Sequence, residues 1–291
     1  MALKSIVCLL NGFDHELSAV EAALALAREN GARLRILHVS YPVYSYSGFF
    51  GEAVMVGGGW AEAFEEAARA RQVEARKLAS SAAAAAGIPL DAPSAPGGAS
   101  ATFAVIENRT NAAIVREMSL CDLLVVGAQK GAADISDDSV TGLALFSSGR
   151  PLLVVRPRPE GAEPAWSGRT CALAWNHSAE AIRSVLSARD ILAAADRVHV
   201  FVAGAPKRPL DAHENQLVMD YLGAHGIAAE IEAVDQAGLG DAEAVLEAVR
   251  RVKADVLVMG AYGHSVFREL LLGGFTAHML EEAEVSLLLA H

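Results

Sequence analysis

The sequence has few cysteines and no long apolar run, and each shortage excludes a class of protein. Three cysteines in 291 residues (Cys8, Cys121 and Cys171) are too few for a disulfide-based scaffold. No uninterrupted run of ~18 apolar residues is present, so the sequence predicts no membrane-spanning helix. The N-terminus has a short apolar run without an A-x-A-like cleavage site, so we expect a strand at 5–10 instead of a signal peptide. The expected location is the cytoplasm.

Basic residues are also fewer than acidic residues. The chain has 24 Lys and Arg against 35 Asp and Glu, which gives a formal net charge of −11. This balance argues against a nucleic-acid backbone or an anionic membrane as the main partner. A small phosphorylated ligand remains compatible with it, because backbone amides at a helix N-terminus can bind phosphate.

Motifs for common catalytic and metal sites are missing as well. The nine histidines show neither H-E-x-x-H nor a Cys/His pair at zinc spacing. No G-x-S-x-G elbow is present, which disfavours a serine hydrolase. The sequence therefore predicts no catalytic residue and no metal site.

What the sequence does contain is an internal repeat. Residues 121–128 read CDLLVVGA and residues 254–261 read ADVLVMGA. Each block has the pattern of a buried parallel strand that ends in a tight turn. A weaker match relates KSIVCLLN at 4–11 to RTCALAWN at 169–176, and both are followed by an Ala- and Glu-rich helix. The chain thus reads as two copies of one unit.

A proline- and glycine-rich stretch, RPRPEGAEPAWSG, separates the copies. We predict a first domain at 1–156, a linker at 157–168 and a second domain at 169–291, below called half one and half two. Strands and helices alternate in each half, which predicts parallel sheets with right-handed crossovers. The predicted strands are 5–10, 33–39, 102–107, 122–126, 151–155, 170–175, 197–203, 228–234, 255–259 and 285–290. The predicted helices are 16–30, 61–86, 110–119, 139–147, 178–194, 211–225, 240–252 and 265–282.

The sharpest motif lies in half two. Gly260 and Gly263 follow the repeated strand, and after nine residues come Gly273 and Gly274 at a predicted helix start. Glycines let the backbone approach a ligand closely, and successive N–H groups form an anion-binding nest. Neither a Walker P-loop nor the G-x-G-x-x-G fingerprint is present. The alternative interpretation is that these glycines belong to two independent tight turns with no ligand.

This motif, together with the opening strand of half two and the Asn-x-Ser that follows it, resembles the universal stress protein family. The resemblance covers nearly the whole chain, as two tandem copies of the family's domain. The resemblance implies α/β domains with five-stranded parallel sheets, Rossmann-like and adenine nucleotide alpha hydrolase-like. It also implies a pseudo-dimer built through the last strands, Leu152–Val155 and Val285–Ala290. Some members bind ATP through G-x2-G-x9-G-Ser/Thr, and others bind no nucleotide. We therefore expect a binding or regulatory role in the stress response, with at most slow ATP hydrolysis and either a homodimer or this intramolecular pseudo-dimer.

The resemblance implies an adenine-nucleotide site in half two only. Gly274 stands where the family has Ser or Thr, and Thr276 is a partial replacement for that hydroxyl. Asn176 stands where ATP-binding members have Asp, and Ala174 and Ala203 would line the adenine slot. The full predicted set is Ala174, Asn176, His177, Ser178, Ala203, Met259, Gly260, Tyr262, Gly263, His264, Gly273, Gly274, Phe275 and Thr276.

Half one departs further from this pattern. Gly127 and Gly131 are one residue too far apart, and Asp138 aligns with Gly273. The preceding loop, with Asp134 and Asp137, carries further carboxylates that would repel phosphate. Asn11 again replaces the family's Asp, and Phe13 replaces its small polar residue. We expect no ATP binding in half one.

Two alternatives belong to other functional classes. Residues 41–60 (YPVYSYSGFFGEAVMVGGGW) hold six of the chain's 17 aromatic residues. A segment this apolar must cover something. It would be either a lid over an apolar ligand in the groove between the halves, or a surface that packs on the other half or on a second subunit. The remaining alternative is an interaction scaffold that acts through dimerisation.

Overall fold

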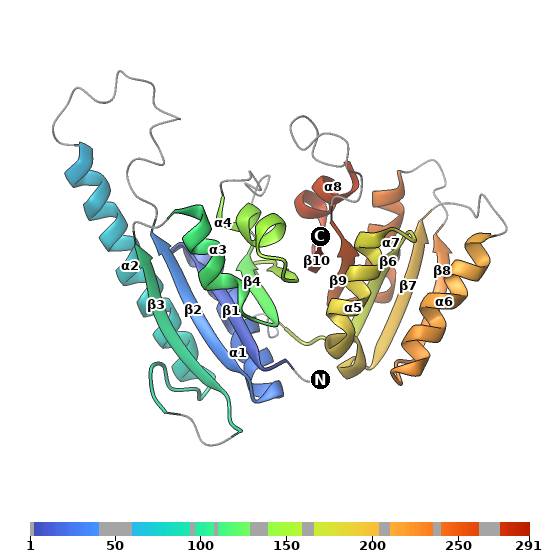
Figure 1. Cartoon of the computed structure of the whole chain (residues 1–291), viewed down its shortest axis with the longest axis horizontal. Helices are drawn as coiled ribbons and strands as arrows, with labels where there is room; N and C mark the ends of the chain where they lie inside the picture. Colours follow the sequence, from blue (N-terminus) through green and yellow to red (C-terminus); the bar gives the residue numbers. More distant parts are fainter. Residues whose placement is uncertain are drawn as a thin grey trace.

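The computed structural model describes residues 3–40, 60–93, 97–107, 110–128, 139–158, 166–203, 210–234, 240–261 and 274–291. They form one ten-stranded sheet in the order β3-β2-β1-β4-β5-β10-β9-β6-β7-β8 (Figure 1). The strands are β1 (Ser5–Leu10), β2 (Arg33–Ser40), β3 (Ser100–Glu107), β4 (Leu123–Gly127), β5 (Leu152–Val155), β6 (Thr170–Trp175), β7 (Arg197–Ala203), β8 (Ala229–Val234), β9 (Val256–Gly260) and β10 (Ser286–Ala290).

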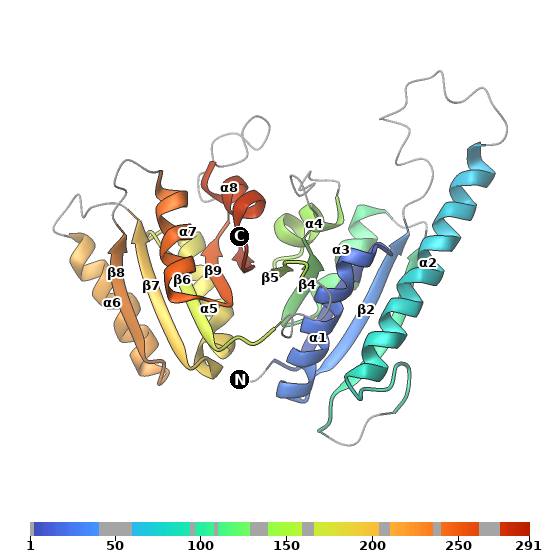
Figure 2. The same ribbon diagram turned by 180° about the vertical axis from the view of Figure 1, so that it is seen from behind.

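Helices cover both faces of this sheet, and two apolar cores lie between the layers. Buried residues of α1, α2, α5 and α6 share the first core, and those of α3, α4, α7 and α8 share the second. The helices are α1 (Leu17–Asn30), α2 (Trp60–Ala85), α3 (Asn111–Ser119), α4 (Val140–Gly142), α5 (Ala179–Ala194), α6 (Leu210–Ala224), α7 (Asp241–Val252) and α8 (Gly274–Glu282). The sheet twists between its halves, so α5 and α6 face the viewer in Figure 1, whereas α1 and α2 do so in Figure 2.

The two halves have the same topology and meet at one antiparallel strand pair. Within each half the strands pair in parallel, and β5 pairs with β10 in the register Leu287↔Val154, Leu288↔Leu153 and Leu289↔Leu152. All the residues of these two strands are buried. The predicted α/β class and the pseudo-dimer through the last strand of each half are both confirmed.

The repeated Asp at the start of each matching block has a structural task. The Asp122 carboxylate accepts hydrogen bonds from the N–H groups of Lys4 (2.7 Å) and Ser5 (2.9 Å), where β1 begins. In half two the Asp255 carboxylate accepts from Thr170 N–H at 2.8 Å, where β6 begins. Each Asp thereby ties the start of its half's first strand to the neighbouring strand.

Most predicted elements are found within two residues of their expected ends. Gly31 (φ 54°) and Gly226 (φ 72°) take the left-handed conformation expected of glycines after helices. One predicted helix is different in kind: residues 139–147 form the short α4 and then a π-helical turn, Leu143–Ser147. Of predicted helix 265–282, only Gly274–Glu282 lies among the described residues, and of the aromatic segment 41–60 only Trp60, which begins α2.

Within the described part of the chain, every helix is too short or too polar to cross a membrane.

Candidate functional site

The predicted site lies where neighbouring strands of half two end. β9, β6 and β7 are adjacent and parallel, so their carboxyl ends meet at one edge of the sheet. In open parallel sheets this is the edge where ligands bind. The arrowheads of β2 and β7 point to the same side of the molecule in both views, so both halves present this edge on that side (Figures 1 and 2).

Apolar side chains of the predicted site belong to the second of the two cores, which also contains α8 residues. Met259 of β9 is buried there, and Ala174 of β6 and Phe275 of α8 pack against the same cluster. Thr276 is also buried, at 4% exposure, so its hydroxyl lies inside the protein. A Cβ added at Gly274, in the same turn, would meet no atom of the described residues within 4 Å.

The loop between β6 and α5 is held by its own hydrogen bonds. The Asn176 side-chain oxygen accepts from the Ser178 N–H at 3.2 Å, and the Ser178 hydroxyl accepts from the Ala181 N–H at 3.1 Å. Ser178 is therefore the N-cap of α5, a task that serine performs well. His177 between them has a φ of 64°, which is uncommon for a residue with a side chain.

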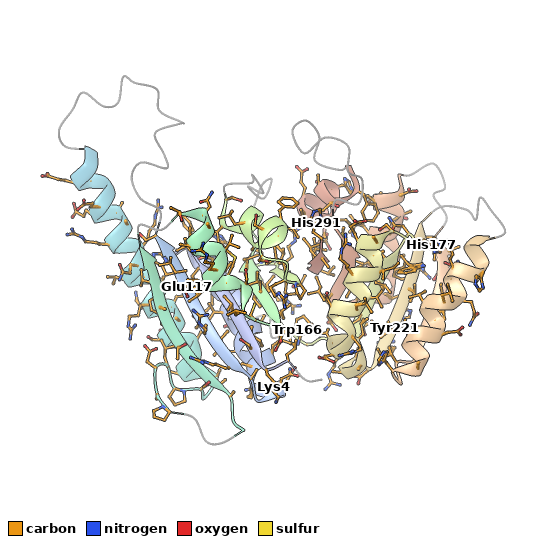
Figure 3. All side chains as sticks on the ribbon, in the orientation of Figure 1. Lys4, Glu117, Trp166, His177, Tyr221 and His291 are labelled. Atoms are coloured by element: carbon orange, nitrogen blue, oxygen red, sulfur yellow. The ribbon has the colours of Figure 1, made fainter. Side chains whose placement is uncertain are left out.

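The His177 side chain points from this loop towards α6. Its Nδ1 lies 3.4 Å from a carboxylate oxygen of Glu214, an ion-pair distance without hydrogen-bond geometry. Its ring also meets the Trp175 ring edge to face, with centroids 5.5 Å apart (Figure 3 labels His177). These contacts place His177 between Trp175 of β6 and Glu214 of α6.

Gly260 allows α5 to approach the end of β9. A Cβ added at Gly260 would lie 2.6 Å from the backbone nitrogen of Ala181 and 2.6 Å from the backbone carbon of Glu180. The missing side chain is thus required for packing of the helix against the strand.

Two described carboxylates near this edge, those of Glu243 and Glu180, are already paired. The Glu243 carboxylate lies 3.1 Å from His278 Nε2 of α8 and 3.1 Å from Arg250. The hydrogen bond from His278, followed by that from Arg250, lowers the pKa of Glu243. Arg183 pairs with Glu180 at 2.6 Å. Backbone N–H groups and the dipoles of α5 and α8 contribute positive potential at this edge.

Half one supports the elements that carry this site. The Arg156 guanidinium donates to the backbone oxygens of Met279 (3.0 Å) and Leu280, in the last turns of α8. Burial lowers the pKa of Arg156. The His291 side chain is 3.0 Å from the Ala261 carbonyl oxygen and meets the Phe146 ring edge to face (Figure 3 labels His291).

The matching loop of half one holds a buried carboxylate. Glu16 is 3% exposed and accepts hydrogen bonds from the N–H groups of Asn11, Gly12 and Phe13. The Phe13 ring lies under the Arg71 guanidinium, 5.2 Å away, and stacks on His15. Asp134, Asp137 and Asp138 lie outside the described residues.

Comparison with known proteins decides the family. The sequence profile of the universal stress protein family matches residues 2–156 and 177–291. The chain belongs to the universal stress protein family. No curated protein sequence matches it.

Solved universal stress proteins share the fold over the whole chain. The protein from Archaeoglobus fulgidus DSM 4304 is 13% identical with a TM-score of 0.66, over 98% of this chain and 96% of that one. A putative member from Pseudomonas aeruginosa UCBPP-PA14 is 16% identical with a TM-score of 0.56, over 99% and 93%. A protein of unknown function from Pseudomonas aeruginosa PAO1 is 16% identical with a TM-score of 0.53, over 99% and 92%.

The universal stress protein fold brings part of the predicted set together. Ala174, Met259 and Phe275 share one core, and Asn176, His177 and Ser178 lie at the same edge of the sheet, on a loop that also contacts α6. Four predicted residues lie outside the described chain, and of Ala203 only the backbone is described. The four are Tyr262, Gly263, His264 and Gly273.

Sequence reasoning missed Glu16, Glu214 and Arg156. A position-by-position comparison of the two copies would have found Glu16, because half two has Ala181 at the same distance from the strand-closing Asn. Glu214 and Arg156 carry no local signal, since both act across long separations in sequence.

Within the described part of the chain, no cluster of three or more His, Cys, Asp or Glu side chains suits a metal ion.

Proposed function

We propose that this universal stress protein binds one adenine nucleotide per chain, at the carboxyl-end edge of half two. The observation that carries this proposal is the first turn of α8, where a Cβ added at Gly274 would meet no described atom and where Phe275 packs against the core that contains Met259. The N-terminus of a helix at the carboxyl-end edge of a parallel sheet suits the anionic tail of a nucleotide.

We propose that the protein has a regulatory role in the cytoplasm and that its ligand is ATP. We expect it to hydrolyse ATP slowly at most. Phosphoryl transfer depends on positioned metal ligands and a residue that orients the attacking water. The described residues at this edge offer Asn176 and Ser178, which already hydrogen-bond within their loop. A nucleotide would then act as a signal that changes the surface of half two.

Native mass spectrometry with added ATP tests this proposal. We expect one nucleotide per wild-type chain, and loss of that mass on Gly263→Asp, which adds a carboxylate within the glycine motif. A nucleotide-free spectrum at millimolar ATP, for both wild type and Gly274→Ser, would refute the proposal. A retained mass of lipid size would favour the apolar-ligand alternative, and an unliganded dimer the scaffold.

A second prediction concerns Gly274. Gly274→Ser places a hydroxyl where many family members have one, in space that is open. One added hydrogen bond is worth about 0.5–1.5 kcal/mol, so the Kd for ATP should fall about two- to tenfold. Gly274→Ala is the matched control, because it adds the same carbon without the hydroxyl. Equal affinity of the two variants would contradict a phosphate contact at this position.

A further inference from the structure

The Glu16 carboxylate is held as a bound anion would be. One oxygen accepts from the N–H groups of Gly12 and Phe13 at 2.9 Å each, and both oxygens contact the Asn11 N–H, at 2.8 and 3.0 Å. The Asn11 side-chain amide donates a further bond at 3.2 Å. Successive N–H groups that converge on one acceptor form an anion nest. In each of these bonds the carboxylate is the acceptor, which is the pattern of an ionised group.

This carboxylate lies at the edge of half one where a ligand would be expected. A Cβ added to Gly127, the last residue of β4, would lie 3.2 Å from Glu16 Cα and 3.3 Å from its Cγ. Gly260 has the equivalent place in half two, and there an added Cβ would touch Glu180 and Ala181. These contacts fall on both Glu180 and Ala181, and Ala181 is the one that follows Asn176 by as many residues as Glu16 follows Asn11, so Glu16 and Ala181 match in sequence position.

The two loops share a left-handed residue at the same place but differ in what fills them. Gly12 (φ 88°) and His177 (φ 64°) are both left-handed, and each follows the Asn that comes directly after the first strand of its half. In half two the nearest carboxylate on the helix, Glu180, is paired with Arg183 at 2.6 Å. Ala181 has no side chain that can return to the loop. Half two thus keeps the left-handed turn without an internal anion, and there the Ser178 N–H donates to the neutral side-chain oxygen of Asn176 at 3.2 Å.

We propose that Glu16 is an internal ligand that closes half one to external anions, and that Ala181 leaves the equivalent loop of half two open to an anionic oxygen of its ligand. The second part rests on the proposed nucleotide site, whereas the first part does not. Glu16 is then a specificity-determining residue that limits the chain to one anion-accepting half. Burial raises the pKa of Glu16, while the N–H groups of Phe13, Asn11 and Gly12 oppose that shift. The nest therefore offsets part of the cost of burying the charge.

Chemical rescue tests the first part. Glu16→Ala removes the carboxylate and leaves the N–H groups facing a gap, so the variant should unfold at lower temperature than wild type. Sodium formate supplies a carboxylate of suitable size and should raise the midpoint of Glu16→Ala by about 2–4 °C or more, with no such rise for wild type. Formamide, which has a similar shape and no charge, should not do so.

Glu16→Gln is the matched control, because its side chain fills the space and leaves no room for formate. We expect formate to leave its midpoint unchanged. If Glu16→Ala folds only poorly, its refolding yield with and without formate replaces the midpoint as the readout. A response to formate that is equal in wild type, Glu16→Ala and Glu16→Gln, or absent from all three, overturns the proposal.

The reciprocal variant tests the second part. Ala181→Glu supplies half two with the internal anion of half one and should raise the Kd for ATP at least tenfold, measured by calorimetry. Ala181→Gln has the same size and no charge, and should weaken binding less. Equal binding by wild type and a folded Ala181→Glu refutes this part. If wild type binds no ATP, the proposed function fails, and the formate experiment still decides the role of Glu16.

Discussion

At the scale of single residues, several residues whose types suggest a binding or catalytic role instead stabilise the fold. Ser178 caps α5, and Gly260 provides the space that α5 needs to approach β9. Asp122 and Asp255, which first marked the repeat, secure the beginnings of β1 and β6. Of the described parts of this edge, the ligand we propose would meet mainly backbone, in the first turn of α8 and the loop after β6.

The glycines of half two should therefore differ in their tolerance of a side chain. Gly260→Ala pushes a methyl group against the backbone of α5, and such overpacking costs about 1–3 kcal/mol of unfolding free energy. Gly274→Ala meets open space in a helical turn and should leave stability unchanged or raise it by up to about 1 kcal/mol. Urea unfolding of both variants measures the difference, and similar losses would contradict the packing role of Gly260.

The three thiols should be inert in the folded protein. Cys8, Cys121 and Cys171 are all buried, and burial raises the pKa of Cys121 and of Cys171 to about 12. The thiolate is the reactive form, so a disulfide reagent at pH 8 should label none of them until denaturant is added. Rapid labelling of the native protein would show that one of these sites opens.

At the scale of elements, the pattern of apolar residues and the glycines at helix ends predict the fold well. Strands such as β4 and β9 are buried on both faces, so their apolar runs are unambiguous, and Gly31 and Gly226 mark helix ends. The π-helical turn at Leu143–Ser147 was not foreseen, because its composition is that of an ordinary helix. The site is harder to predict, since the Glu16 contacts depend on a folded loop and the Arg156 contacts on the approach of the two halves.

Helix α8 should depend on the arginine that caps it. Arg156→Ala removes hydrogen bonds to Met279 and Leu280 at a helix C-terminus, where a cation is favourable. The side chain is only partly buried, so we expect a loss of about 1–2 kcal/mol in unfolding free energy. Arg69→Ala, in an exposed ion pair with Glu65, is the control and should cause no measurable change. A loss no larger than that of the control would mean that half one does not stabilise α8.

At the scale of the whole molecule, the two copies form one sheet but are not equivalent. Half one fills its first loop with Glu16 and sends Arg156 to α8, while half two keeps the open turn at Gly274. The sequence repeat predicts the shared architecture. The difference in ligand binding that we propose for the two halves rests on single substitutions such as Glu16 in one half and Ala181 in the other. The effect of such a substitution depends on the folded loop, so the sequence alone does not predict it.

The antiparallel pairing of β5 with β10 also affects how the two halves can evolve. In an assembly of two identical chains, every substitution appears twice, once in each subunit. Here the partner strands belong to one polypeptide, so a substitution appears once and the other copy is untouched. Tethering also keeps the partner's effective concentration high at any dilution, so the pair does not separate while one member diverges. A covalent pair can thus evolve an asymmetry that a homodimer cannot.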